Sequence, residues 1–171
     1  MATKPKPVNL ALQGGGAHGA FTWGVLDRIL EDGRLAIAGV SGTSAGAMNA
    51  VALADGYTRD GPDGARAALD HFWRTMSEGA KNSPLKRTPY DQLTGYWGLD
   101  RNPVYHMMDA LTRIASPYQL NPMNMNPLRD LLEESIDFDM VRNCTAFKLY
   151  ISATNVQSGK VKVFPREDLT A

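Results

Sequence analysis

Short apolar runs alternate with longer amphipathic stretches over the first 55 residues. Val8–Leu12 is an apolar run that stops at three glycines, and residues 35–40 form a second apolar run of similar length. Each run has the length and composition of a buried strand. Residues 17–31 and 47–54 instead repeat their apolar positions every three to four residues, which predicts a helix after each strand. The order strand, turn, helix, strand, turn, helix predicts an α/β fold that begins with parallel strands.

The rest of the chain predicts further helices and a strand hairpin. The helices are expected at residues 65–78, 104–115 and 127–135, and the two strands of the hairpin at 147–154 and 160–164. Residues 55–64 are dense in Gly and Asp and predict a surface loop, while residues 79–103 show no clear period and predict a long irregular insertion. We therefore expect a short tail over 1–7. Residues 8–171 then form one three-layer α/β domain, with a mainly parallel central sheet and helices on both faces.

Composition narrows the classes of protein that need to be considered. Among 171 residues, 18 Lys and Arg balance 18 Asp and Glu, so no general attraction to nucleic acid is implied and we expect no nucleic-acid partner. A single cysteine, Cys144, excludes an internal disulfide and a cysteine-clustered zinc site, and predicts a buried apolar residue. No apolar stretch is long enough to cross a bilayer, and the expected location is cytoplasmic.

The strongest chemical signal is Gly42-Thr43-Ser44-Ala45-Gly46, a G-x-S-x-G sequence between a predicted strand and a predicted helix. Such a turn, called a nucleophile elbow, holds its serine in a strained backbone conformation at the tip of the strand. Gly42 and Gly46 allow neighbouring backbone to pass closely. The helix that follows places its positive end near the Ser44 hydroxyl, which favours an oxyanion there. Ser44 is therefore the candidate nucleophile.

A second glycine-rich turn, residues 14–19, follows the first predicted strand. Its unhindered N–H groups lie beside the end of the sheet where Ser44 is expected, and they can bind an oxyanion. The same residues also match G-x-G-x-x-G, the pattern of a dinucleotide-binding turn. That alternative expects an acidic residue at the end of the second strand, which here ends Val40-Ser41-Gly42. Since Glu31 and Asp32 belong to the intervening helix instead, we favour the oxyanion role.

In this order and spacing, the two turns resemble the N-terminal part of the catalytic domain of patatin-like phospholipases of the bacterial type. The resemblance runs from about Val8 through Ala54, and more loosely through the strand that ends at Ser152–Asn155. It implies hydrolysis of lipid acyl esters through an acyl-serine intermediate on a Ser-Asp dyad, with no metal and no organic cofactor. The residues that it implicates are the nucleophile Ser44 and the oxyanion donors Gly14, Gly15, Gly16 and Ala45.

The sequence departs from the family pattern in one respect. The family carries Asp-Gly-Gly or Asp-Gly-Ala, which supplies the general base, after the strands found here at residues 147–164. No such motif follows them, and Asp63-Gly64-Ala65 matches only in letters, because it lies where a turn and a helix start are expected. We therefore expect the catalytic Asp to lie outside these 171 residues, and this segment alone to be incomplete as an enzyme.

Two other interpretations stay open. A Ser-His-Asp triad is permitted by the positions of His71 and His106, although both are expected to be partly buried helix residues. A lipid-binding or interaction module that keeps the fold but lacks the base is the alternative from another class. For either class, Trp97 with its neighbouring tyrosines and basic residues is compatible with transient contact with a membrane surface.

Overall fold

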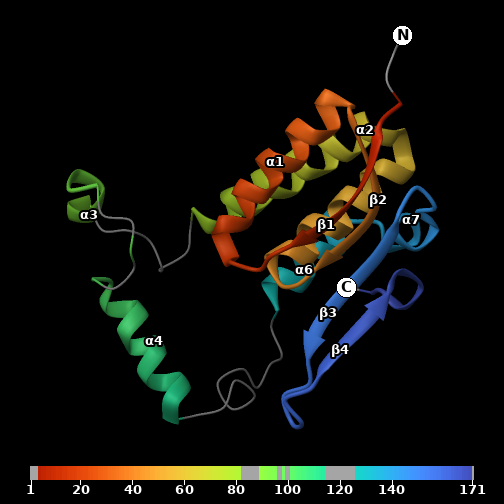
Figure 1. Ribbon diagram of the computed structural model, residues 1–171. Helices are drawn as coiled ribbons and strands as arrows, with labels where there is room; N and C mark the ends of the chain where they lie inside the picture. Colours follow the sequence, from red (N-terminus) through yellow and green to blue (C-terminus); the bar gives the residue numbers. More distant parts are fainter. Residues whose placement is uncertain (1–3, 82–88, 96–97, 99–100, 115–125, 171) are drawn as a thin grey trace. The chain divides into compact units, whose positions relative to one another are not determined.

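The computed structural model describes residues 4–81, 89–95, 98, 101–114 and 126–170. Four strands form one sheet in the order β1-β2-β3-β4 (Figure 1). Their bounds are β1 Lys6–Leu12, β2 Leu35–Gly42, β3 Lys148–Thr154 and β4 Val161–Pro165. The first three strands are parallel and β4 is antiparallel to β3. The predicted α/β class and mainly parallel sheet are confirmed.

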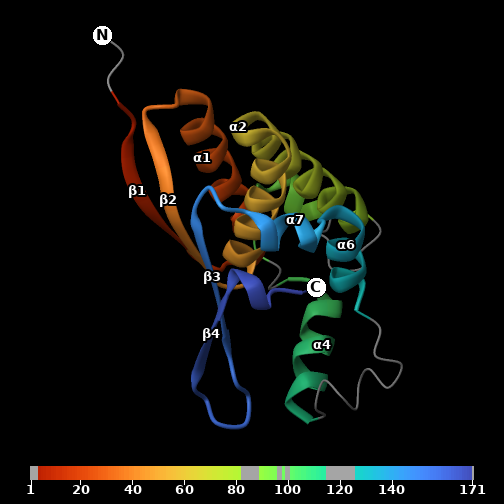
Figure 2. The same ribbon diagram turned by 90° about the vertical axis from the view of Figure 1, so that its right-hand side faces the viewer.

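The two faces of the sheet differ in burial. Val40 and Leu149 are paired across β2 and β3, and each is 2% exposed. The next paired row, Ser41 and Tyr150, is exposed on the opposite face. Figure 2 shows helices α1, α2 and α7 together on one side of the strands, as expected when successive right-handed crossovers advance in one direction. Of the three layers expected, the sheet and one helical layer are seen in the described part of the chain.

The longest helix corrects the loop predicted at residues 55–64. Helix α2 spans Ala45–Ala80, and within it only Asp60 and Gly61 leave helical geometry, with φ −151° and +56°. Its two halves pack closely where Gly56 meets Gly64, because a Cβ on Gly56 would lie 2.2 Å from the Gly64 carbonyl oxygen. Two of the glycines that predicted a loop, Gly56 and Gly64, therefore permit close packing between the two halves of α2, while Gly61 lies at the break between them.

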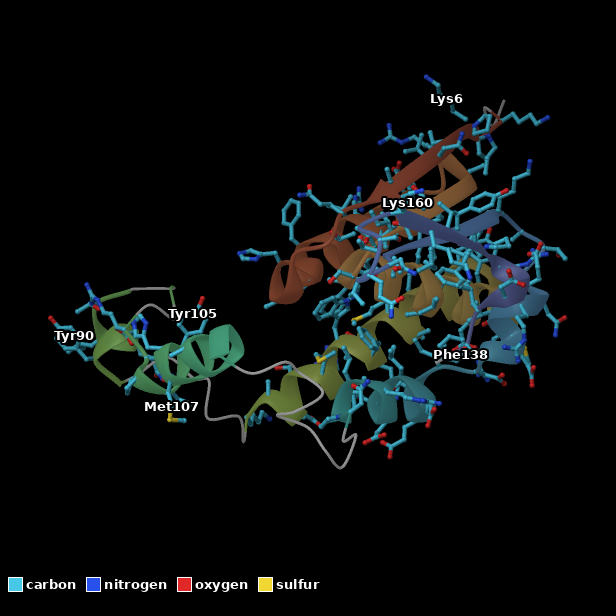
Figure 3. All side chains as sticks on the ribbon, turned by 90° about the horizontal axis from the view of Figure 1, so that it is seen from below. Lys6, Tyr90, Tyr105, Met107, Phe138 and Lys160 are labelled. Atoms are coloured by element: carbon cyan, nitrogen blue, oxygen red, sulfur yellow. The ribbon has the colours of Figure 1, made fainter. Side chains whose placement is uncertain are left out.

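The chain divides into two compact units, residues 1–75 with 129–171, and residues 76–128. The second unit contains α3 (Pro89–Leu93) and α4 (Pro103–Ile114). Helix α4 is confirmed, and the Asn102 side-chain oxygen accepts from the Val104 N–H at its start, at 2.8 Å. The short α3 lies inside the insertion predicted to be irregular. Tyr90, Tyr105 and Met107 of this unit are exposed (Figure 3).

The last third of the chain follows the prediction with one addition. Helix α6 (Pro127–Ser135) and the β3–β4 hairpin are confirmed, and Gly159 occupies the hairpin turn with φ +67°. Helix α7 (Phe138–Asn143) was not predicted, because six residues are too few to show a helical period. The Asp137 carboxylate starts this helix by accepting from the Asp139 N–H at 2.9 Å. Cys144 is buried and free, as predicted.

Candidate active site

The register of β1 and β2 brings the two glycine turns together. The strands are parallel, and their last paired residues are Leu12 and Gly42, so both turns leave the same edge of the sheet. The Thr43 N–H donates to the Leu12 carbonyl at 3.4 Å. A Cβ on Gly14 would lie 3.0 Å from the Ser44 Cβ, so the first turn contacts the second directly.

Ser44 occupies the strained position that a nucleophile elbow requires. Its φ is +51°, and it is the single non-glycine residue with positive φ in the part of the chain that the structure describes. The side chain is exposed and lies one residue before α2, whose first turn closes on Ser44 when the Ala47 N–H donates to the Ser44 carbonyl at 2.8 Å. The hydroxyl therefore stands at the positive end of a helix.

The glycines flanking Ser44 are required by close backbone contacts. A Cβ on Gly46 would lie 2.1 Å from the Leu12 carbonyl oxygen, and a Cβ on Gly42 would lie 2.6 Å from the Gly46 carbonyl oxygen. A larger residue at position 46 would force the turn away from β1, and one at position 42 would force the start of α2 away from β2. The two glycines of the G-x-S-x-G sequence thus occupy the two positions, 42 and 46, at which a neighbouring backbone segment leaves no room for a side chain.

The amide groups proposed as oxyanion donors border the same edge. Gly15 and Gly16 have φ values of +157° and +55°, and the turn is closed where the His18 N–H donates to the Gly15 carbonyl at 3.1 Å. Ala45 is the first residue of α2, so its N–H has no partner inside the helix. The structure therefore brings Gly14–Gly16, Ser44 and Ala45 together around one strand edge.

The histidines of the alternative triad lie on helices, as predicted, but they are exposed rather than partly buried. His71 lies in the second half of α2, and His106 lies on α4 in the second compact unit. The His106 ring contacts the Tyr105 ring edge-on, with centroids 5.8 Å apart. Trp97, singled out for membrane contact, lies outside the described residues.

Two aspartates that precede a glycine, Asp32 and Asp55, have partners of their own in the structure. Asp55 lies three helical turns beyond Ser44 along α2, or about 16 Å at a rise of about 1.5 Å per residue. Its buried carboxylate accepts from the Arg59 guanidinium at 2.9 Å. Burial raises the pKa of the Asp55 carboxyl above its usual value, and this ion pair opposes the shift only in part. Asp32 ends α1 and pairs with Arg34. Both carboxylates therefore have structural partners.

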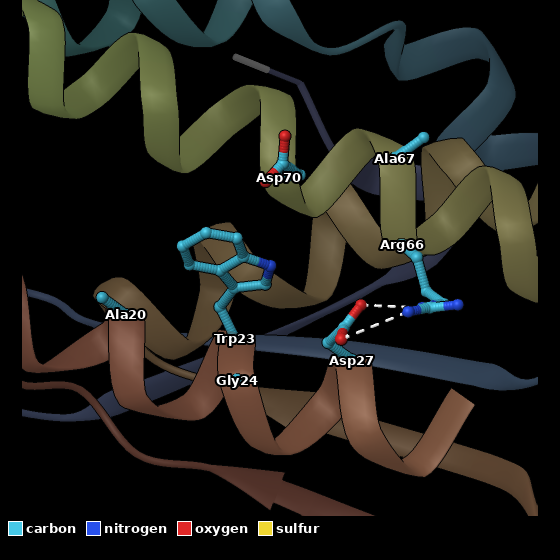
Figure 4. Close-up of a pocket in the computed structure, with 7 residues that line it drawn as sticks. All are labelled: Ala20, Trp23, Gly24, Asp27, Arg66, Ala67 and Asp70. Carbon is cyan, nitrogen blue, oxygen red and sulfur yellow. Dashed lines mark hydrogen bonds and ion pairs between the residues drawn. The ribbon is translucent and has the colours of Figure 1, made fainter. Parts of the chain in front are cut away.

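Two hollows lie near the first helix. One, of about 410 Å³, borders the glycine turn and is lined by Gln13, Gly14, Gly15, His18, Gly19, Phe21 and Thr22. The other, of about 560 Å³, lies between α1 and the second half of α2, where Asp27 pairs with Arg66 at 2.8 Å (Figure 4). Only the first is lined by residues of a proposed oxyanion donor turn. Within the described residues, no cluster of three or more His, Cys, Asp or Glu could hold a metal ion.

One buried polar residue beside the site was not recognised in the sequence. Asn49 is 0% exposed and lies one turn into α2. The signal was available, because Asn49 is a lone amide within a run of small apolar residues, where a polar side chain needs a hydrogen-bond partner.

The chain is thus an α/β protein in which an exposed, strained serine lies between a parallel strand and a helix and faces a glycine turn, the arrangement expected of a nucleophile elbow. The family model for patatin-like phospholipases matches residues 10–169. The chain belongs to the patatin-like phospholipase family.

Among solved structures, the chain is similar to part of a much longer protein. A chain of the heterodimeric ExoU–SpcU complex from the type III secretion system of Pseudomonas aeruginosa is 22% identical, with a TM-score of 0.47. The match covers 98% of this chain and 35% of that one, so this chain spans about a third of its length. No curated protein matches the sequence. None of the described helices has both the length and the apolarity needed to cross a membrane.

Proposed function

We propose that this chain carries the nucleophile and oxyanion hole of a serine acyl hydrolase acting on lipid esters. The observation that supports this most directly is the backbone of Ser44, an exposed serine with φ +51° at a helix start. A residue other than glycine is uncommon in this left-handed backbone conformation and is strained there. Such strained residues are found most often at functional sites. Membership of the patatin-like phospholipase family supports lipid esters as the substrate class.

The proposed reaction proceeds in two steps. The Ser44 Oγ attacks the ester carbonyl carbon and transfers its proton to an aspartate, which this proposal places outside residues 1–171. The N–H groups of Gly14–Gly16 and Ala45 donate to the oxyanion of the tetrahedral intermediate. The intermediate then expels the alcohol, which takes up a proton, and leaves an acyl-serine. Water attacks this ester, releases the fatty acid and restores the hydroxyl.

A fluorophosphonate probe, which phosphonylates activated serines, tests this proposal. We expect the full-length wild-type protein, which includes the aspartate, to be labelled at one site, and Ser44→Ala to lose the label completely because the attacking oxygen is gone. Ser41→Ala is the matched control, because Ser41 lies three residues earlier, exposed on β2, and should label like the wild type. Peptide mass mapping of the labelled protein identifies the modified residue.

Two outcomes would redirect the proposal. A full-length wild-type protein that takes no label would favour the lipid-binding or interaction module. A loss of labelling by several orders of magnitude in His106→Ala or His71→Ala would favour a triad, because a triad histidine activates the serine directly. Labelling of both histidine variants within about threefold of the wild-type rate is the result that the dyad requires.

A further inference from the structure

Four residues meet in a buried cluster directly behind the two turns. We call Gly19, Ala45, Asn49 and Trp73 the Asn49 cluster. Asn49 is 0% exposed and Trp73 is 8% exposed. Gly19 begins α1, Ala45 and Asn49 lie in the first turns of α2, and Trp73 comes from the second half of α2. This half runs beside α1 (Figure 4), which allows the Trp73 ring to contact the start of that helix.

The Asn49 side chain forms three hydrogen bonds in this cluster. Its Nδ2 donates to the Gly19 carbonyl at 3.0 Å and to the Ala45 carbonyl at 3.2 Å. Its Oδ1 accepts from the Trp73 Nε1–H at 2.8 Å. Since two carbonyl oxygens need donors and an indole N–H needs an acceptor, only this orientation of the amide satisfies all three partners. Trp73 therefore fixes which way Asn49 points.

Apolar packing tightens the same cluster. A Cβ on Gly19 would lie 2.8 Å from both the Ala45 Cβ and the Trp73 Cζ2. The start of α1 thus leaves no room for a side chain at position 19 beside Ala45 and Trp73. Gly19 ends the glycine-rich turn, three residues after Gly16, and Ala45 follows Ser44 directly. The cluster therefore joins the segment that holds the oxyanion amides to the segment that holds the nucleophile.

We infer that Asn49 is a positioning residue that sets the spacing between the Ser44 hydroxyl and the Gly14–Gly16 amides, and that Trp73 holds it in orientation. This inference rests on the proposed function, because spacing matters only if both groups act on one substrate. Oxyanion donors act at about 2.7–3.1 Å, and a displacement of about 1 Å can lower a rate by about 100-fold. Asn49 is buried and acts through its neighbours rather than on the substrate.

The first test measures the second-order rate of fluorophosphonate labelling. Trp73→Phe keeps an aromatic ring but removes the N–H, and we expect it to label about 10-fold more slowly than the wild type. Asn49→Asp keeps the side-chain size but removes both donors, and we expect a loss of about 100-fold. The matched control is Leu69→Val, which trims a fully buried side chain one turn before Trp73 and leaves the three hydrogen bonds of Asn49 in place. The control should label at the wild-type rate.

A second readout does not depend on activity. The Ala47 and Met48 N–H groups both donate to the Ser44 carbonyl, at 2.8 and 3.1 Å. If the cluster holds the first turn of α2, Trp73→Phe should speed hydrogen exchange at these two amides about 10-fold relative to the amides of Ala52–Ala54. Leu69→Val should change both groups of amides alike. Since Trp73→Phe retains the ring, it keeps the test usable if Asn49→Asp does not fold.

The outcomes separate this inference from the proposed function. Labelling of Trp73→Phe at the wild-type rate, in a wild type that labels at Ser44, overturns the inference and leaves the proposed function standing. A full-length wild type that does not label overturns the proposed function, and with it the positioning role. Unchanged relative exchange at Ala47 and Met48 in Trp73→Phe overturns the inference whatever the labelling shows.

Discussion

At the scale of single residues, Ser44 combines chemical exposure with backbone strain. The left-handed conformation costs a residue other than glycine about 1–2 kcal/mol. Here it is maintained because Gly46 packs against the Leu12 carbonyl and because the first turn of α2 closes on Ser44. The strain is thus borne by the fold, and it turns the hydroxyl out of the sheet edge.

Ser44→Gly should therefore stabilise the protein relative to Ser44→Ala. Both variants remove the hydroxyl, but only glycine relieves the positive φ, so the free energy of unfolding should be higher for Ser44→Gly by about 1 kcal/mol. Urea unfolding followed by circular dichroism measures the difference. Equal stabilities of the two variants would show that Ser44 is not strained in solution.

At the scale of elements, the site depends on how closely β1, β2 and α2 approach one another. The position of Gly46 is the tightest of these contacts, because a Cβ there would lie 2.1 Å from the carbonyl oxygen of Leu12, which ends β1 and pairs with Gly42 of β2. A backbone atom cannot rotate away as the end of a side chain can. The elbow therefore allows no methyl group at this point.

Gly46→Ala should destabilise the protein by more than about 2 kcal/mol and abolish labelling by the fluorophosphonate probe, because the turn must separate from β1. Gly24→Ala is the matched control. Gly24 lies inside α1 with no atom within 4 Å of an added Cβ, so this change should stabilise by about 0.5–1 kcal/mol. Chemical denaturation of both variants provides the comparison. A Gly46→Ala protein as stable as the wild type would contradict the close contact.

At the scale of the whole molecule, one buried carboxylate links stability to pH. Asp55 is 2% exposed, within a helix that crosses most of the core, and burial raises the pKa of its carboxyl above the usual 3.8. The Arg59 guanidinium and the Asp137 backbone favour the charged form but do not fully offset burial. An acid whose pKa is raised by folding binds its proton more tightly in the folded state. Its ionisation therefore lowers stability as pH rises.

Comparison of the wild type with Asp55→Asn tests this linkage. Below about pH 3.8 both forms carry a neutral side chain at position 55, and the difference in their unfolding free energies should be constant. As pH rises from about 3.8 to the raised pKa, the wild type should lose stability relative to Asp55→Asn, and above the raised pKa the difference should be constant again. Urea unfolding at a series of pH values from 3 to 7 measures this difference. A trend in the opposite direction would mean that the Arg59 ion pair outweighs burial.

Much of the candidate site could be predicted from local sequence. Apolar runs of strand length, the change to a helical period and the glycines at each turn are properties of consecutive residues. They therefore predicted both strand-to-helix turns and an exposed Ser44 between a strand and a helix. The same local reasoning wrongly predicted a surface loop at residues 55–64. Gly56 and Gly64 do not form turns there, because they lie where the two halves of α2 pack too closely for a side chain. It also missed the short α7, whose start depends on the Asp137 cap.

By itself, the sequence determined the α/β class, the order of its elements and a serine flanked by glycines at a helix start, since these follow from periodicity and from the steric freedom of glycine. Tertiary structure alone decided that Leu12 pairs with Gly42, which brings the two turns into contact. It also decided that Trp73 returns 24 residues along the chain to hold Asn49. Contacts of this kind depend on the register of strands and on how a helix folds back, which no local pattern records.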